Sequence, residues 1–344
     1  MTQAYGKFVK DLALKFRLMH LLKWCVLATL AFSTSTSAKL SFALIGKTKN
    51  DSFYEQSFKG CQAFSRTISD LTCIYDGADD YQDVRTQVLI VKEYINKGID
   101  GLLISTTDSR FLVSGALQLA KEKGIPVITF DSDLLEQHKT YRLTYVGTNN
   151  FDFGNALGQA AKKYKKLDPQ PICIQSGHQT TPNLNKRIEG VRHALSDGSV
   201  TKLNGSTGWI EYDRCPLYTM GRRDDSLNQL LTILDYKHPP IFIAVAGFAQ
   251  FNTDYTSKLL SYKKRIQEGD ITIISADTEQ IQLKALSNGL SSINIGQNPH
   301  EMGRLSAELL YRYVKSGEKP QKNTYYLDFH YCNQDNVATC TVNY

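Results

Sequence analysis

Short apolar runs and longer amphipathic segments alternate along this chain, and the two patterns predict different elements. The clearest amphipathic segment has Val84, Val88, Val91 and Ile95 at positions i, i+4, i+7 and i+11, which lie on one face of an α-helix. Gly98 comes after them, as expected for a residue that ends a helix. The apolar runs are continuous rather than alternating, which is typical of parallel strands covered on both faces.

The alternation continues along the chain and predicts the fold class. Strands are expected near residues 40–45, 72–75, 101–105, 125–130, 171–175, 206–210, 240–246, 271–276, 291–296 and 324–330. Helices are expected near residues 54–67, 84–97, 112–123, 152–165, 184–196, 222–234, 253–265, 279–288 and 300–316. Such strand–helix repeats form parallel sheets, and roughly 300 residues exceed one ordinary sheet. We therefore expect an α/β protein with two Rossmann-like lobes, each a parallel sheet flanked by helices.

The lobes are expected to be joined by several short connections rather than by one linker. Residues 145–149 form an apolar strand that ends in glycine and polar residues before a new helix, and further crossings are expected near Gln297 and beside the strand at 324–330. We predict a first lobe of residues 39–147 and 298–323 and a second of residues 148–297 and 324–344. The three connecting strands would act as a hinge that lets the lobes close on a ligand.

The first 38 residues have the order of regions found in export signals. A basic stretch ends at Lys23, an apolar run covers residues 24–32, and small residues lead to Ala38, so we expect cleavage after Ala38 and an exported mature protein. A buried N-terminal helix is the alternative, and either Met1 or Met19 could be the start. This segment carries +4 of the net charge of +6. The remainder is nearly neutral and lacks the excess of basic residues typical of nucleic-acid-binding proteins.

Six cysteines remain when Cys25, inside the apolar run, is set aside. An even number of cysteines in an exported chain predicts disulfides, although 15 pairings are formally open. Proximity in sequence favours Cys61–Cys73 and Cys332–Cys340, and elimination leaves Cys173–Cys215. A zinc site is disfavoured because no C-x-x-C motif occurs. We expect no metal and no cofactor.

Polar and aromatic residues come after several of the predicted strands. Asp51, Phe53 and Tyr54 come after the first strand, Asp131 ends the fourth, and Asp277 and Gln297 end two later ones. Ligands of open parallel sheets bind beyond the carboxyl ends of the strands. Carboxylates and amides bind hydroxyl groups, and aromatic rings cover the apolar face of a sugar.

These residues also have simpler interpretations. Asp131 and Asp277 could be turn or hinge residues, and one of the two adjacent rings, Phe53 or Tyr54, could belong to the core. Asp108 and Asp133 are equally well explained as caps of the helices after them.

Residues 50–54, 97–105, 124–131 and 145–149 together resemble the type I periplasmic binding proteins, the ribose- and galactose-binding family that shares its fold with the sugar-binding core of the lactose-repressor family. The resemblance covers residues 40–329. It implies that Asp51 binds a sugar hydroxyl and that Phe53 and Tyr54 stack on the ring. It further implies that residues from both lobes contact the ligand, namely Asp131, Arg187, Asp277 and Gln297. Tyr218 or Trp209 would supply a second stacking ring.

Two positions depart from the family pattern. Ser132 stands where the ribose-type proteins have an arginine, and Ala246-Gly247-Phe248 stands where the family has an Asn-Asp pair. The second change removes an amide that would contact a hydroxyl, which argues against ribose itself as the ligand.

The function expected from this resemblance is that of a monomeric periplasmic solute-binding protein that captures a small polar ligand, with a sugar favoured, for an ABC permease. The alternatives are a ligand-sensing component of a signalling or chemotaxis system that contacts a membrane sensor, and an exported carbohydrate-active enzyme. An enzyme is disfavoured because the sequence has no G-x-S-x-G elbow and no phosphate-binding loop. A DNA-binding repressor is disfavoured because the N-terminal segment is apolar.

Overall fold

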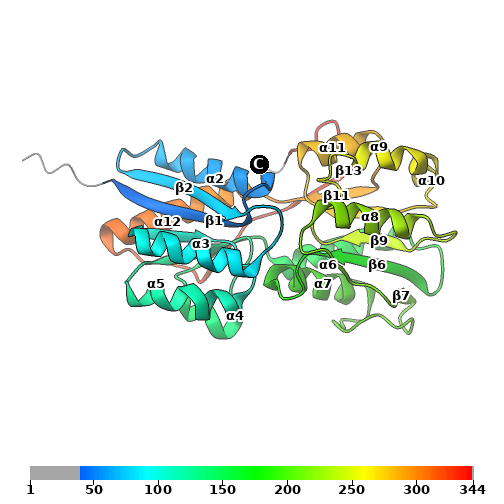
Figure 1. Ribbon diagram of the computed structural model, residues 1–344. Helices are drawn as coiled ribbons and strands as arrows, with labels where there is room; N and C mark the ends of the chain where they lie inside the picture. Colours follow the sequence, from blue (N-terminus) through cyan, green and yellow to red (C-terminus); the bar gives the residue numbers. More distant parts are fainter. Residues whose placement is uncertain (1–38, 343–344) are drawn as a thin grey trace, which may run out of the picture. The chain divides into compact units, whose positions relative to one another are not determined.

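A computed structural model describes residues 39–342 of the chain and contains two α/β lobes, as predicted (Figure 1). The sheet of the first lobe has the order β12-β5-β4-β3-β1-β2, and all its neighbouring strands are parallel. Its strands are β1 (Leu40–Thr48), β2 (Leu71–Ala78), β3 (Gly101–Ile104), β4 (Val127–Phe130), β5 (Tyr145–Gly147) and β12 (Thr324–Tyr326). None of the helices among residues 39–342 is long and apolar enough to span a membrane.

Helices cover both faces of this first sheet because successive side chains of each strand point to opposite faces. Phe42 and Leu44 of β1 pack with α2 (Ser52–Ser65) and α12 (Pro299–Ser316). Ala43 and Ile45 pack on the other face, where α3 (Val84–Lys97), α4 (Ser109–Leu112), a π-helical turn (Val113–Leu117) and α5 (Gln118–Glu122) lie. This double cover explains why β1 is a continuous apolar run.

The sheet of the second lobe has the order β13-β11-β10-β9-β6-β7, with β8 paired to β6. Its strands are β6 (Gln170–Ser176), β7 (Trp209–Glu211), β8 (Leu217–Tyr218), β9 (Ile241–Ala244), β10 (Ile273–Ala276), β11 (Ile293–Gly296) and β13 (His330–Asn333). Only β13 is antiparallel to its neighbour in this described sheet. Its helices are α6 (Asn150–Lys162), α7 (Pro182–Leu195), α8 (Arg223–Leu234), α9 (Tyr255–Leu259), α10 (Lys263–Gln267) and α11 (Gln280–Ser287).

The expected strand at 324–330 is divided between the two lobes, which corrects the predicted boundary. Residues 324–326 form β12 and pair with β5 in the first sheet, whereas β13 begins at His330 and pairs with β11 in the second. Apolar residues, Leu327 and Phe329, also occur where the chain crosses from the first lobe to the second. The sequence pattern therefore predicts one continuous strand. The chain passes between the sheets three times, after β5, after β11 and after β12.

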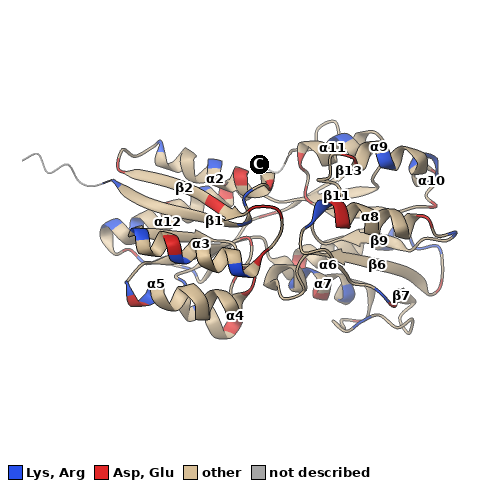
Figure 2. Cartoon of the chain, viewed as in Figure 1, with Lys and Arg blue, Asp and Glu red and all other residues tan. Residues whose placement is uncertain are grey.

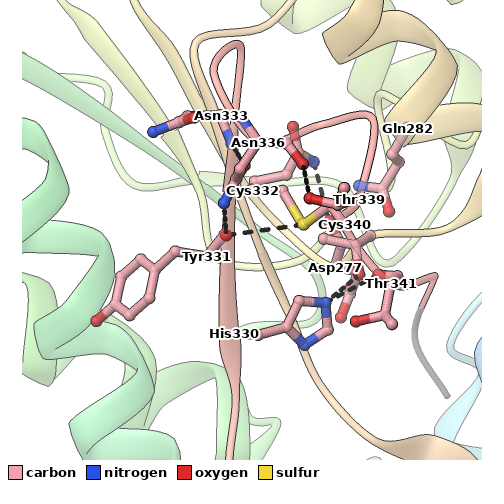
Figure 3. Close-up of a disulfide and its surroundings, with 12 residues drawn as sticks. Asp277, Gln282, His330, Tyr331, Cys332, Asn333, Asn336, Thr339, Cys340 and Thr341 are labelled. Atoms are coloured by element: carbon pink, nitrogen blue, oxygen red, sulfur yellow. Dashed lines mark hydrogen bonds between the residues drawn. A yellow bond between two sulfur atoms is a disulfide. The ribbon is translucent and has the colours of Figure 1, made fainter.

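Disulfides join the three expected cysteine pairs, which confirms the prediction. Cys61–Cys73 connects α2 to β2, and Cys173–Cys215 connects β6 to the segment before β8. Cys332–Cys340 connects β13 to the segment that comes after it (Figure 3). The expected signal segment and its cleavage site at Ala38 lie outside the described residues.

Glycines allow the paired helices of each lobe to approach closely. A Cβ atom on Gly154 of α6 would overlap the backbone of Arg187 in α7, and one on Gly303 of α12 would overlap the backbone of Ser57 in α2. The close α6–α7 crossing fixes where Arg187 lies relative to the edge of the second sheet.

We predict that Gly154→Ala lowers the free energy of unfolding by about 1–3 kcal/mol, since α7 has to shift to admit the methyl group. Urea denaturation would measure the change. The control is Gln159→Ala, an exposed position of the same helix, which should stay within about 0.5 kcal/mol of the wild type. Equal stability of the two variants would contradict the argument.

We also predict that protein consisting of residues 39–344 has no thiol that iodoacetamide can alkylate under denaturing conditions without reductant, and six after reduction. Intact-mass spectrometry provides the count. The double variant Cys332→Ser/Cys340→Ser should give four after reduction and none before. Three or more alkylated cysteines in the unreduced wild type would refute the pairing.

Candidate functional site

A small cavity lies where the carboxyl-terminal ends of strands from the two lobes face each other. It is lined by Lys47, Asp51, Phe53, Tyr54, Gln82, Asp131, Asn183, Leu184, Arg187, Ala246, Phe248, Phe251, Asp277 and Gln297. The free space among these side chains is about 30 Å³, enough for one or two water molecules. A sugar-sized ligand therefore requires the lobes to be further apart while it enters.

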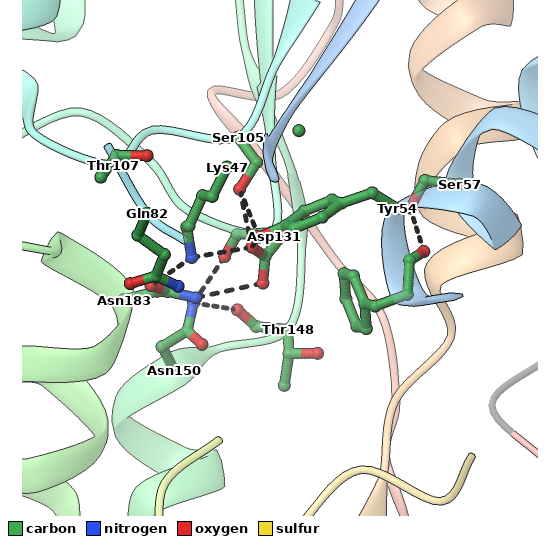
Figure 4. A network of polar contacts seen from close by, with 12 residues as sticks. Lys47, Tyr54, Ser57, Gln82, Ser105, Thr107, Asp131, Thr148, Asn150 and Asn183 are labelled. Carbon is green, nitrogen blue, oxygen red and sulfur yellow. Dashed lines mark hydrogen bonds and ion pairs between the residues drawn. The ribbon is translucent and has the colours of Figure 1, made fainter. Parts of the chain in front are cut away.

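Asp131, directly after β4, has the densest set of contacts in the cavity (Figure 4). Its Oδ2 accepts hydrogen bonds from Tyr54 at 3.0 Å and Ser105 at 2.7 Å, and lies 3.1 Å from Nζ of Lys47. Its Oδ1 accepts a 3.1 Å hydrogen bond from the amide of Asn183 on α7. One carboxylate thus has partners from both lobes.

Asp131 has a lowered pKa and an unusual backbone conformation, and Asp277 shares the second feature. Burial alone would raise its pKa, but Lys47 and Arg187 outweigh that effect and hold the pKa below its ordinary value. Asp131 has φ of 56° and Asp277 has φ of 72°, the left-handed region that residues other than glycine rarely adopt. Each such residue costs about 1–3 kcal/mol, and such strain concentrates at functional sites.

Arg187 is 2% exposed. It connects several segments of the second lobe near the carboxyl-terminal ends of the strands. Its guanidinium donates to Oδ1 of Asn150 at 2.8 Å, to the carbonyl of Val245 at 2.9 Å and to Oε1 of Gln297 at 2.9 Å. The ring of Phe153 lies 4.5 Å from its central carbon, a cation–π contact. The guanidinium also lies 3.7 Å from Asp131.

Two further carboxylates face the cavity with neutral partners. Asp277 comes after β10 and accepts hydrogen bonds from the amide of Gln297 at 2.8 Å and from the backbone of Gly247. Asp51 caps α2, because its side chain accepts a 3.0 Å hydrogen bond from the backbone of Phe53. Burial raises the pKa of both groups, that of Asp51 to about 6.

Aromatic side chains form the apolar part of the cavity wall. Phe53, Phe248 and Phe251 are each less than 8% exposed and line the space beside Leu184 and Ala246. Phe248 lies in the segment where the family's Asn-Asp pair was expected. The replacement therefore exchanges polar contacts for a ring.

The structure brings seven of the nine predicted ligand-binding residues to this cavity: Asp51, Phe53, Tyr54, Asp131, Arg187, Asp277 and Gln297. The other two, Trp209 and Tyr218, lie elsewhere. Trp209 pairs with Gln170, the first residue of β6, so it lies at the opposite end of the parallel strands and packs in the core. Tyr218 is 42% exposed on β8 and does not line the cavity.

Lys47, Gln82, Asn183, Phe248 and Phe251 line the cavity and were not among the predicted residues. A signal was present for two of them. Lys47 belongs to the polar segment after the first strand, and Asn183 precedes Arg187 by four residues, which places both on one helix face. No comparable spacing marks the other three.

A larger pocket of about 660 Å³ adjoins the cavity and shares Asp51 and Phe248 with it. It lies between the loop after β2 and the start of α8, where charged residues of both signs gather (Figure 2). The lobes touch here, because the backbone of Gln82 donates to the carbonyl of Met220 at 2.8 Å and Arg222 stacks on Tyr81. We call this pocket the outer pocket.

Comparison with known proteins gives consistent results. A sequence profile of the periplasmic binding protein domain matches residues 42–319. A D-ribose/D-allose-binding protein of Pseudomonas aeruginosa is 26% identical over 189 residues, which are 54% of this chain and 58% of that protein. A ribose import binding protein of Bacillus subtilis is 25% identical over 84% of this chain and 86% of its own length.

Solved structures show the same fold. An ABC transporter solute-binding protein of Burkholderia graminis in complex with D-arabinose superposes with a TM-score of 0.74 at 22% identity, covering 90% of this chain and all of that one. One of Agrobacterium vitis with bound D-fucose has a TM-score of 0.74 at 20% identity, covering 86% and 96%. These relatives are binding proteins rather than enzymes. The match over residues 42–319, together with two parallel-sheet lobes that meet at their strand ends, shows that this chain belongs to the type I periplasmic binding protein family.

Proposed function

We propose that this protein captures a sugar between its two lobes in the periplasm and delivers it to an ABC importer. The observation that carries the proposal is the convergence of carboxylates, a guanidinium, amides and phenylalanine rings from both lobes on one buried cavity. Polar groups of this kind bind hydroxyls, and aromatic rings cover the C–H faces of a sugar ring. The family places the protein outside the cytoplasm, and cleavage after Ala38 is part of the proposal.

The arrangement of the site supports binding by closure. Asp131 and Lys47 belong to the first lobe, whereas Asn183 and Arg187 belong to the second, so the contacts between these two pairs of residues form only when the lobes are together. A ligand that contacts both lobes stabilises a closed arrangement that is wide enough to hold it. A membrane partner can then distinguish loaded from unloaded protein by lobe position, which is how we propose that the importer recognises it.

A membrane sensor in place of an importer is the second candidate for the partner, because it would read the same closed form. Hydrolysis of a sugar is not proposed. Glycosidases use a carboxyl group of raised pKa together with a second carboxylate free to react. Both oxygens of Asp131 are already engaged by protein groups.

Titration calorimetry of residues 39–344 with pentoses, hexoses, their amino derivatives and polyols tests the proposal, and we expect at least one to bind. Asp277→Asn should weaken that binding about 10- to 100-fold, since a hydrogen bond to a charged group is replaced by a weaker one. Asp213→Asn, at an exposed position, is the matched control and should bind as the wild type does. Absence of binding across the whole panel would contradict the proposed function.

A second prediction concerns pH and the stability of the protein without added sugar. Burial raises the pKa of Asp51 from an ordinary value of 3.8 to about 6, so the folded protein holds more protons than the unfolded chain between about pH 4 and 6. Stability from this group is therefore present at low pH and is lost as the pH rises through 6. Asp51→Asn keeps the helix cap and removes the titration.

The free energy of unfolding of Asp51→Asn minus that of the wild type should accordingly increase by about 2 kcal/mol between pH 4 and pH 7. Urea denaturation of both proteins at four pH values gives this difference, in which titrating groups that do not interact with Asp51 cancel. A difference that does not change with pH would show that Asp51 titrates at an ordinary pKa.

A further inference from the structure

The charges that face the cavity do not balance. Its lining contains two cationic side chains, Lys47 and Arg187, and three carboxylates, Asp51, Asp131 and Asp277. Both cations are directed to the same carboxylate, since Asp131 lies 3.1 Å from Lys47 and 3.7 Å from Arg187. Within residues 39–342, neither Asp51 nor Asp277 has a cationic group within 4.0 Å.

These two carboxylates are nevertheless buried, with Asp51 9% and Asp277 5% exposed. Their partners are neutral N–H groups, the backbone of Phe53 for one, and Gln297 and Gly247 for the other. A buried carboxylate without a cation in contact is costly. Burial is the main cause of the raised pKa of each group, and Asp277 adds to the shift of Asp51. Arg223 offsets part of the shift of Asp51 and Arg187 part of that of Asp277, but neither guanidinium contacts the carboxylate.

The rest of the wall favours a cation over a hydroxyl group. The phenylalanine rings that line the same space, Phe53, Phe248 and Phe251, cannot bond a hydroxyl, but a ring face attracts an ammonium group. A hydroxyl donor would satisfy the carboxylate lone pairs without neutralising their charge. An ammonium group does both, because it carries three donors and a positive charge.

The outer pocket also has an excess of negative charge. Its lining includes five aspartates, at positions 51, 79, 80, 224 and 225, and two arginines. The arginines are engaged within the protein, since Arg222 stacks on Tyr81 and Arg223 donates to the carbonyl of Asn50. Lys49 pairs with Asp79, so four aspartates remain against the two arginines. A pocket with this excess of negative charge raises the local concentration of cationic ligands.

We infer that the ligand is a polyhydroxylated amine, an amino sugar or amino polyol, whose ammonium group binds between Asp51 and Asp277 against the phenylalanine rings. The inference rests on the proposed function and narrows its substrate class. The hydroxyl groups of such a ligand are left for the amides and charged groups around Asp131.

Calorimetry at pH 7 with matched ligand sets tests this assignment. Each set shares one carbon skeleton: glucose, glucosamine and N-acetylglucosamine; galactose, galactosamine and N-acetylgalactosamine; sorbitol and glucamine. In at least one set the amine should bind about 10- to 100-fold more tightly than the parent compound. The N-acetyl derivative keeps the nitrogen but loses the charge, so it should show no such gain.

Two variants connect that preference to the named residues. In Asp51→Asn and in Asp277→Asn, the ratio of amine to parent affinity should fall to within about threefold of unity, while Asp213→Asn keeps the wild-type ratio. A neutral parent sugar that binds as tightly as its amine, or a preference unchanged in both variants, overturns the inference and leaves the proposed function standing. Failure of every compound in the matched sets to bind overturns the inference, whereas the proposed function is overturned only if the pentoses and the rest of the first panel also fail to bind.

Discussion

The ion pair between Asp131 and Lys47, buried where the two lobes meet, is the interaction on which the site depends. It joins the ends of β1 and β4 in the first lobe, and the amide of Asn183 extends it to α7 of the second. Breaking such a buried pair by removing one partner typically costs about 3–5 kcal/mol. The pair therefore fixes where the cavity lies and which side chains can face a ligand.

Glycine packing in the second lobe positions Arg187 near this ion pair. Gly154 lets α6 lie directly against α7, and the same crossing holds Arg187 beneath the strand ends, where Asn150 and Val245 orient its guanidinium. The two strained aspartates then project from β4 and β10 toward it. Core packing and ligand recognition are thus linked through one helix pair.

The fold and most of the cavity were predictable from the sequence, because apolar runs locate parallel strands and ligands bind at their carboxyl ends. Asp131 and Asp277 were found in this way. Trp209 was misplaced because the choice rested on its aromatic ring, while its position at the amino end of β7 is set by strand register. Phe248 and Phe251 were missed because a loop without periodicity does not reveal where its side chains point.

The small free volume of the cavity has a kinetic consequence. A cavity of about 30 Å³ cannot hold a sugar, so ligand exchange requires contacts between the lobes, such as Arg222–Tyr81 and Gln56–Glu279, to break first. The rate of that opening sets an upper limit on both arrival and departure. Residence time then depends on side chains that never touch the ligand, and the apparent affinity depends on the fraction of molecules that are open. Selection for faster or slower uptake can act on these contacts while the specificity of the cavity stays the same.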